Sequence, residues 1–301
     1  MKELNHKLQG RPIVFGEVLF DSFPDGSVVM GGAPLNVAWH LRGFGFNPLL
    51  ISRIGDDELG KQVIDTLVDW GLDTSGIQID SEHPTGKVTI SLQDGQPRFS
   101  ILAEQAYDFI DDSRVQQALK DIPVSLIYHG SLAARHPVSR QALESIRSSG
   151  APVFVDINLR EPWWERSQVD HFMYGADWLK LNDIEFITLD GSQPGDATCQ
   201  AFIENFQIRQ LILTLGEQGA RIIADDTVLN GAPVKVENIA DTVGAGDAFS
   251  SIMILGILSG WNMAQTMPRA LEFAARVCSI RGATIADRDV YAEFFKQWDK
   301  G

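Results

Sequence analysis

The chain has few cysteines, no run of 18 apolar residues and no excess of positive charge. It contains two cysteines in 301 residues, and 25 Lys and Arg against 40 Asp and Glu, for a formal net charge of −15. Two cysteines that form no CxxC pair are typical of a reducing compartment. The acidic balance argues against a nucleic-acid or anionic-membrane partner, because a basic face supplies the affinity for both.

Targeting segments are also lacking. Residues 1–10 are polar and contain no apolar core of a signal peptide, and no stretch is long enough to span a membrane. We therefore expect a cytoplasmic protein. A hydrophobic content of 44% supports a sizeable core, in one large α/β domain or two small ones.

Several catalytic motifs are missing. The segment Gly16-Glu17-Val18 does not fit the GxGxxG turn that a dinucleotide-dependent oxidoreductase needs after its first strand. There is no Walker A lysine. His40, His129 and His136 show no metal-binding spacing such as HExxH, and we expect them to be packed or solvent-facing residues.

The hydrophobic pattern predicts alternating strands and helices. Expected strands lie at 13–20, 49–54, 124–129, 153–157, 178–181 and 210–214, and expected helices at 34–41, 57–70, 139–148 and 198–206. Alternating units of this kind predict a parallel sheet covered on both faces. Residues 87–92 and 98–102 instead flank Asp94-Gly95, which predicts a hairpin over the strand ends where ligands bind.

The most informative segment is the run DTVGAGD at residues 241–247, followed by apolar residues to Leu258. It predicts a loop that opens onto a helix. Gly244, Ala245 and Gly246 would turn backbone N–H groups toward one point, and the helix start adds further donors. This predicts an anion site with Asp247 beside it as a general base. On spacing alone, a glycine-rich turn in which Asp247 only begins the helix explains the run equally well.

The DTVGAGD run resembles the C-terminal signature of the ribokinase-like (PfkB) carbohydrate kinases. Further segments resemble that family in the same order: GEVLFD at 16–21, GGAPLNVA at 31–38, RIGDDELG at 53–60, DINLR at 156–160, NDIE at 182–185 and TLG at 214–216. The resemblance covers nearly the whole chain. It implies a three-layer α/β/α sandwich in a single domain over 1–301, with a mostly parallel central sheet. It also implies a small β-strand lid, formed by segments at roughly 17–30 and 84–104.

The resemblance assigns sugar binding to Asp21, Gly31, Gly32 and Asn36. A carboxylate accepts from two hydroxyls, an amide both donates and accepts, and glycines let the backbone approach a ligand closely. Arg160 follows a strand end and would steady the sugar or the transferring phosphoryl group. Without the resemblance, Asp21 is a loop acid near a tight turn, and Arg160 is a surface arginine paired with Glu161 or Glu165.

The resemblance assigns the nucleotide side to Asn182, Glu185, Thr214 and Gly216. Asn182 and Glu185 would organise the water shell of Mg²⁺, an ion that keeps several waters and needs few protein ligands. The same two residues also fit a capping-box variant at a helix start, and both interpretations can hold together. Gly216 would let the chain turn past the nucleotide, although a plain turn explains it as well.

Two segments favour the fructokinase branch of the family. Where ribokinases carry an asparagine and a lysine around the sugar site, this chain has Leu19 and Ala33-Pro34, whereas GGAPxN and DxNxR are typical of fructokinases. The resemblance thus implies transfer of the γ-phosphoryl group of ATP to a primary hydroxyl, with D-fructose to fructose 6-phosphate as the leading expectation. The alternatives are a kinase of another ketose, a sugar acid or a nucleoside, and a non-catalytic sugar sensor.

The implied cofactors are ATP and Mg²⁺. Many relatives hold K⁺ near a helix that is shortened at 273–283 here and contains Arg276, which argues against a potassium requirement although Asp241 is present. The expected partners are the sugar and ATP, with no nucleic acid and no membrane. Lid edges of this fold often pair between subunits, which suggests a homodimer through the lid.

Overall fold

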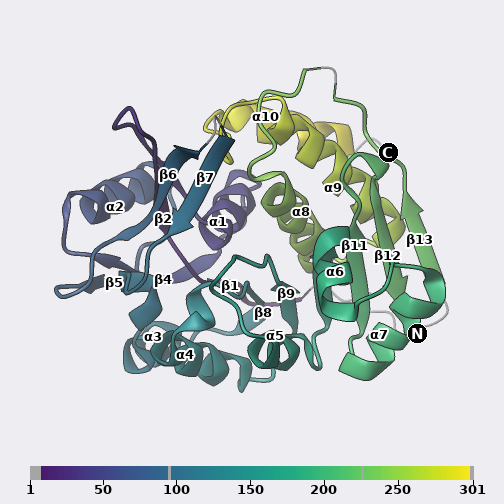
Figure 1. Cartoon of the computed structure of the whole chain (residues 1–301), viewed down its shortest axis with the longest axis horizontal. Coiled ribbons are helices and arrows are strands. Elements are labelled where there is room, and N and C mark those ends of the chain that lie inside the picture. Colours follow the sequence, from purple (N-terminus) through teal and green to yellow (C-terminus); the bar gives the residue numbers. More distant parts are fainter. Residues whose placement is uncertain (1–7, 94–95, 225–226, 237, 299–301) are drawn as a thin grey trace.

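A nine-stranded sheet forms the centre of the computed structural model, which describes residues 8–93, 96–224, 227–236 and 238–298. Its strand order is β13-β12-β11-β10-β9-β8-β1-β4-β5 (Figure 1). From β11 to β5 in this order, each strand is parallel to its neighbour. β12 and β13 are added to β11 as an antiparallel edge. The strands are β1 (Arg11–Phe15), β4 (Leu49–Gly55), β5 (Ile77–Asp80), β8 (Val124–His129), β9 (Val153–Asp156), β10 (Trp178–Asn182), β11 (Gln210–Thr214), β12 (Ala220–Ala224) and β13 (Thr227–Gly231).

Helices cover both faces of this sheet, so two hydrophobic cores form. In β1, Val14 packs into one core, and Ile13 and Phe15 pack into the other, because successive strand side chains point to opposite faces. The first core contains α1 (Ala33–Gly43), α2 (Glu58–Trp70), α8 (Ala245–Ser259), α9 (Met263–Cys278) and α10 (Arg288–Trp298). The second contains α3 (Asp112–Leu119), α4 (Pro137–Arg147), α5 (Arg166–Met173), α6 (Asp183–Asp190) and α7 (Asp196–Phe206). The expected three-layer α/β/α sandwich is confirmed.

Three short 3₁₀ turns complete the described elements: Ala106–Phe109, Ala133–Arg135 and Gly216–Gln218. Within the residues that the structure describes, no helix combines the length and the apolar character needed to cross a bilayer.

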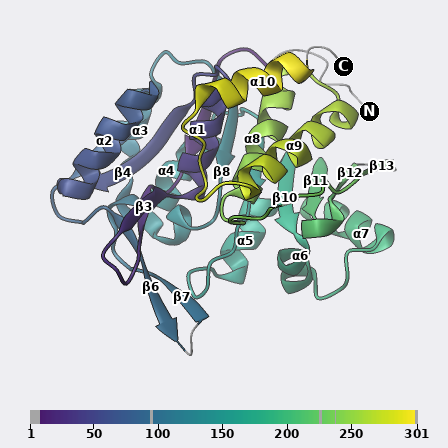
Figure 2. The ribbon, with the colours of Figure 1, turned by 90° about the horizontal axis from the view of Figure 1, so that it is seen from above.

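A smaller sheet has the strand order β3-β2-β6-β7, in which β2 and β6 are parallel and the other pairs antiparallel. Its strands are β2 (Leu19–Ser22), β3 (Val28–Gly31), β6 (Gly86–Gln93) and β7 (Gln96–Ile101). The predicted hairpin is confirmed by the pairing of β6 with β7, although its predicted turn at Asp94-Gly95 lies outside the described residues. Figure 2 shows β6 and β7 extending away from the body of the molecule.

The prediction of one strand over 13–20 is wrong, because the chain forms two strands that join different sheets. β1 ends at Phe15 in the large sheet, and β2 begins at Leu19 in the small one. Gly16 lies at the break, where a Cβ would come within 2.3 Å of the Pro34 ring. A continuous apolar run gives no sign of such a change of sheet, so the pattern missed it.

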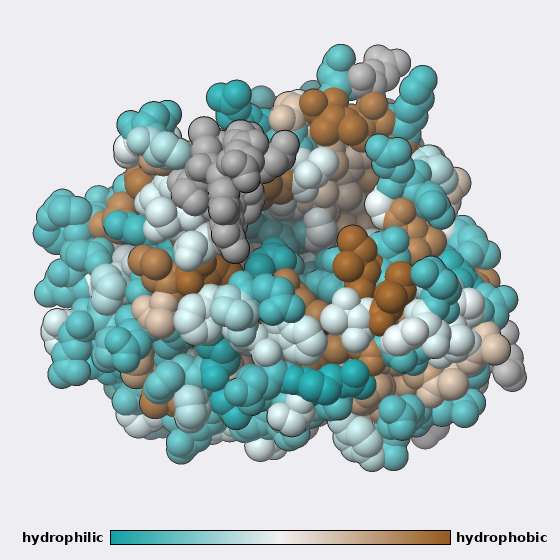
Figure 3. All heavy atoms as spheres, viewed as in Figure 1, coloured by the Kyte–Doolittle hydropathy of each residue, from teal (hydrophilic) through white to brown (hydrophobic). Residues whose placement is uncertain are grey.

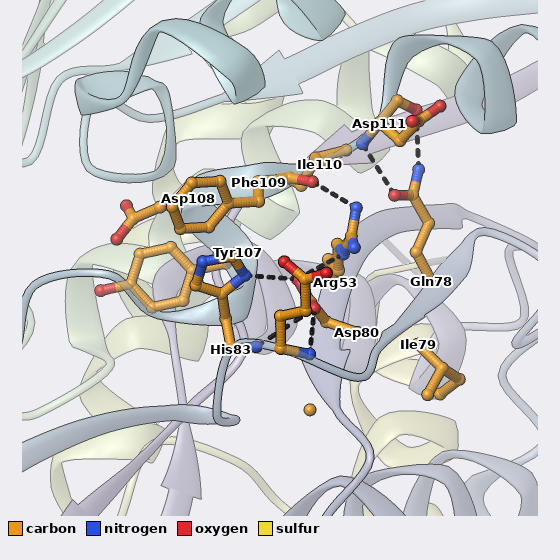
Figure 4. A network of polar contacts seen from close by, with 12 residues as sticks. Arg53, Gln78, Ile79, Asp80, His83, Tyr107, Asp108, Phe109, Ile110 and Asp111 are labelled. Atoms are coloured by element: carbon orange, nitrogen blue, oxygen red, sulfur yellow. Dashed lines mark hydrogen bonds and ion pairs between the residues drawn. The ribbon is translucent and has the colours of Figure 1, made fainter.

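The segment RIGDDELG anchors the base of the small sheet. Arg53 Nε lies 2.8 Å from Asp80 Oδ2, and Arg53 Nη1 donates to the Phe109 carbonyl at 2.7 Å (Figure 4). Asp57 caps α2 and also accepts from the backbone N–H and the hydroxyl of Thr85, at 2.8 and 2.7 Å. Because Thr85 directly precedes β6, these contacts fix where the small sheet begins.

His40 is buried and joins α1 to the chain that follows α9. Its Nδ1 and Nε2 lie 3.0 Å from Tyr291 Oη and from the Ala283 carbonyl oxygen, respectively. Burial lowers the pKa of His40 from 6.5 to about 4. His129 is likewise buried, with its pKa lowered by burial to about 3. Both are therefore packed neutral residues, as expected from the sequence.

The depressed pKa of His40 predicts a loss of stability in acid. The unfolded chain binds the proton first, so the stabilisation is complete above pH 6.5 and is lost as the pH falls toward 4. Relative to His40→Gln, which cannot titrate, the wild type is expected to lose about 2 kcal/mol of unfolding free energy between pH 7.5 and 5. Urea unfolding at several pH values measures this difference. Parallel curves for the two proteins would contradict it.

Candidate active site

The DTVGAGD run forms a loop that leads into α8, as predicted. Gly244 is the residue before the helix and has a left-handed backbone conformation, with φ 79° and ψ −4°. A Cβ at Gly244 would lie 2.4 Å from the Ala283 Cβ, so only glycine fits there. Among the described residues no side chain caps this helix start. The Ala245 N–H donates to the Thr242 carbonyl at 3.3 Å, and the next N–H groups of the first turn of α8 remain for a ligand, which fits an anion site.

Asp247 lies in the first turn of α8 and contacts the residue that the sequence assigned to the sugar. Asn36 of α1 donates from Nδ2 to Asp247 Oδ2 at 2.7 Å, across 211 residues of sequence. The Asn36 Oδ1 atom is buried and has no hydrogen-bond partner among the described residues. A buried acceptor without a partner is costly, so a ligand hydroxyl is well suited to satisfy it.

The pKa of the Asp247 carboxyl is raised above its usual range. Burial raises it most, the hydrogen bond from Asn36 lowers it, and the nearby Asp156 carboxylate raises it again. Lys180 and Arg160 lower it by their positive charges. A base with a raised pKa holds an abstracted proton more readily, provided that it is ionised at the working pH.

The other predicted sugar residues lie on the same side of the site. Gly31 and Gly32 connect β3 to α1, and a Cβ at Gly31 would lie 3.9 Å from Asp21 Oδ2. Burial raises the pKa of Asp21, whereas the charge of Arg160 lowers it. Arg160 is exposed and also lowers the pKa of Asp247, so its charge faces the site. Its Nη1 donates to the Leu159 carbonyl at 3.1 Å.

The surface between the small sheet and α8 is hollowed. Figure 3, in the view of Figure 1, shows this hollow with hydrophilic side chains inside it. Asn36 of α1 donates to Asp247 of α8, and the charge of Arg160 lowers the pKa of both Asp21 and Asp247, so the residues predicted for the sugar and for the base share one part of the fold.

On the nucleotide side, Asn182 and Glu185 form the capping box that begins α6. Asn182 Oδ1 accepts from the Glu185 N–H at 2.8 Å, and Glu185 Oε2 accepts from the Asn182 N–H at 2.9 Å. Glu185 Oε1 accepts in addition from the Leu159 N–H at 2.9 Å. Burial raises the pKa of Glu185, and Lys180 lowers it. The structural interpretation of this pair therefore holds.

The hydrogen bonds of Asn182 and Glu185 also limit how these two residues would bind a magnesium ion. Both Glu185 oxygens already accept a backbone N–H, and each retains a lone pair. Within the described part of the chain, no three His, Cys, Asp or Glu side chains gather as a set of direct metal ligands. The residues fit an ion held through its own waters, as Mg²⁺ commonly is.

Thr214 and Gly216 lie at the end of the neighbouring strand. Thr214 stands opposite Asn182 in the pairing of β10 with β11, so both face the carboxyl edge of the sheet. Gly216 begins the 3₁₀ turn that follows, with φ 54° and open space around it. Sequence reasoning therefore grouped residues that the fold places at adjacent strand ends.

Three buried charged residues of the site were missed: Glu17, Asp156 and Lys180. Glu17 follows β1 and is 5% exposed, and burial raises its pKa to about 7. Lys180 Nζ lies 3.0 Å from Asp156 Oδ1 in the neighbouring strand. A lysine inside the apolar segment Trp-Leu-Lys-Leu was a signal for this pair, because a lysine is rarely buried unless its charge is paired.

Comparison with known proteins shows the family of the chain. The sequence pattern of the pfkB family of carbohydrate kinases matches residues 17–289. The chain belongs to this family of phosphotransferases and has its ribokinase-like fold.

Individual relatives are similar along most of their length. The fructokinase of Escherichia coli is 29% identical over 264 residues, which cover 82% of this chain and 84% of that protein. The crystal structure of fructokinase from Vibrio cholerae O395 in its fructose, ADP and calcium ion bound form has a TM-score of 0.79 at 26% identity, and covers 96% of this chain and 99% of that one. An uncharacterized sugar kinase of Pyrococcus horikoshii in complex with ATP has a TM-score of 0.77 at 26% identity, over 90% of this chain and 93% of that one.

Proposed function

We propose that this carbohydrate kinase transfers the γ-phosphoryl group of ATP to the primary 6-hydroxyl of D-fructose. The observation that carries the proposal is the hydrogen bond between Asn36 and Asp247 beside the uncapped start of α8. It joins a residue suited to sugar hydroxyls to a residue suited to remove a proton. The anion site next to both is where a phosphoryl group would lie.

In this mechanism the sugar binds beneath the small sheet, which acts as a lid. Asp21 and the free Oδ1 of Asn36 accept from sugar hydroxyls, and the backbone at Gly31 and Gly32 lies close to the ring. Asp247 then accepts the proton of the attacking hydroxyl. The reaction needs positioning and electrostatic stabilisation, with no covalent intermediate on the enzyme.

The phosphates would lie over Gly244, Ala245 and Gly246, where N–H groups of the first turn stabilise the charge on the transferring oxygens. Asn182, Glu185, Thr214 and Gly216 would line the nucleotide side. Mg²⁺, held through water near Asn182 and Glu185, would neutralise charge on the phosphates when bound. The ATP and ADP bound to the two similar sugar kinases support ATP as the donor.

Fructose is favoured among the sugars by the segments GGAPLN and DINLR and by similarity to fructokinases. The Vibrio cholerae relative was crystallised with fructose. The alternative is a kinase of another ketose, a sugar acid or a nucleoside on the same fold. A non-catalytic sugar sensor is less favoured, because such a protein has no need of a base beside an anion site.

ADP release with Mg²⁺ and ATP tests the choice of acceptor. The panel is fructose, ribose, tagatose, 2-keto-3-deoxygluconate, adenosine and no acceptor. We expect kcat/KM for fructose to exceed that for the others by about tenfold or more, a difference of roughly 1.4 kcal/mol in transition-state binding. Faster turnover of another acceptor would keep the kinase and change its substrate. Sugar binding with no turnover would favour the sensor.

Two further expectations remain proposals. We expect activity without K⁺, because the segment 273–283, near which many relatives hold the ion, is shortened here and contains Arg276. We also expect a homodimer through the small sheet, where Val28 and Val29 are exposed apolar side chains.

A further inference from the structure

Lys180 is a buried lysine in an otherwise apolar strand. Its side chain is 8% exposed, and its neighbours Leu179 and Leu181 in β10 are buried. A buried ammonium group is costly unless it is paired. The register of the sheet places Asp156 of β9 opposite Lys180, and Lys180 Nζ lies 3.0 and 3.2 Å from its two carboxylate oxygens.

This ion pair lies directly beneath the glycine loop. Asp156 Oδ2 also accepts from Ser250 Oγ of α8 at 2.8 Å, which ties the helix to the sheet. A Cβ at Gly246 would lie 3.1 Å from Lys180 Nζ, so the ammonium group packs closely against the first turn of α8. Gly246 is the residue immediately before Asp247.

We propose that Lys180 is a positioning residue for phosphoryl transfer, whose ammonium group keeps the Asp247 carboxyl ionised and seats the first turn of α8 against the sheet. The inference rests on the proposed role of Asp247 as general base. Such a base must carry its negative charge before the reaction begins. The negative charge of Asp156 disfavours ionisation of Asp247. The positive charge of Lys180, which is paired with Asp156, favours it.

The groups around Asp247 support this role for Lys180. The polar and charged groups that face it are Glu17 after β1, Asn36 of α1, Tyr128 of β8, Asp156 of β9, Arg160 after β9 and Lys180 of β10. Burial and Asp156 raise the pKa of Asp247, whereas Asn36, Lys180 and Arg160 lower it. Arg160 is exposed, so water and salt screen its charge. Lys180 is the buried cation of this set.

The pH dependence of kcat/KM in two variants tests the proposal. Lys180→Met keeps the length of the side chain and removes the charge. We expect its acid limb to move up by about one pH unit, so that activity on the acid side of the limb falls about tenfold more than activity on the plateau above it. Asp156→Asn leaves the cation and removes the opposing carboxylate, so its acid limb is expected to move down. If the ion pair only stabilised the fold, the acid limbs of Lys180→Met and Asp156→Asn would not move in opposite directions.

The control is Arg11→Met, which breaks the ion pair of Arg11 with Asp73 at the opposite end of β1, 2.7 Å between Nη1 and Oδ2. We expect it to lower the thermal midpoint without moving the acid limb. If Lys180→Met also leaves the limb in place, Lys180 only stabilises the fold and the proposal is wrong. Should Lys180→Met fail to fold, the neutral pair Lys180→Met with Asp156→Asn avoids a lone buried charge. Its acid limb should lie above that of Asp156→Asn, which keeps the cation, and equal limbs in these two variants would overturn the proposal.

A second measurement does not depend on turnover. The difference in unfolding free energy between wild type and Asp247→Asn changes with pH between the pKa of Asp247 in the unfolded chain and its higher pKa in the folded protein. Because the folded pKa of Asp247 is raised, its contribution is lost as the pH rises through that value. Repeating the comparison in the Lys180→Met background should extend this range to higher pH. If the range is unchanged, the proposed role of Lys180 is wrong, whether or not any tested sugar is phosphorylated. If the range is extended but no sugar is phosphorylated, only the proposed function is wrong.

Discussion

Replacing Asp247 with asparagine is expected to lower kcat by a factor of about 10²–10⁴, the usual contribution of a general base. Asparagine has nearly the same shape and still offers an oxygen to Asn36 Nδ2, which lies 2.7 Å from Asp247 Oδ2 in the wild type. It cannot accept the proton of the attacking hydroxyl. KM for the sugar should change little, because the variant keeps the hydrogen bond that orients Asn36. Steady-state kinetics at saturating ATP measure both quantities.

Asp289→Asn is the matched control for this prediction. Asp289 is also an acid in the first turn of a helix, α10, and it is exposed. If Asp247 acted only through the helix dipole, the two variants would behave alike, with an effect of less than about 1 kcal/mol. Near-normal turnover in Asp247→Asn would remove Asp247 from the role of base.

Gly244→Val is expected to lower both the thermal midpoint and kcat. The backbone there has φ 79°, and a Cβ would meet the Ala283 Cβ at 2.4 Å. The left-handed conformation alone costs a non-glycine residue about 1–2 kcal/mol, and relieving the contact must move either the loop or Ala283. A displacement of about 1 Å in the anion site is enough to lower kcat about 10²-fold.

Gly150 supplies the control for the backbone cost. It has nearly the same conformation, with φ 77°, and nothing lies within 4 Å of its Cβ position. Gly150→Val should therefore lower the thermal midpoint modestly and leave kcat unchanged. Equal kinetic behaviour of the two valine variants would contradict the view that close packing against Ala283 places the loop.

The sequence predicted the layers of this fold well, because each depends on local pattern. Alternating strands and helices indicated a sheet covered on both faces, and the helix expected at 57–70 is α2 (Glu58–Trp70), which buries Val63, Leu67 and Trp70. The break between β1 and β2 could not be predicted in this way. It depends on the Pro34 ring packing at Gly16, a contact between residues 18 positions apart.

The site was predictable where one short motif carries it and not where distant segments meet. The run DTVGAGD contains the helix start, the glycines and Asp247. The bond of Asn36 to Asp247 spans 211 residues, and no local pattern encodes it. The pairing of Lys180 with Asp156 depends on the register of two parallel strands, which composition does not fix.

Identifying the product of the wild-type protein with D-fructose and Mg²⁺-ATP tests the central claim most directly. Mass spectrometry and ³¹P NMR would follow the sugar, and a coupled assay would follow ADP. The account predicts fructose 6-phosphate and ADP in about equal amounts, since one phosphoryl group moves in each turnover. Fructose binding without any phosphorylated product, under conditions where ATP also binds, would contradict it.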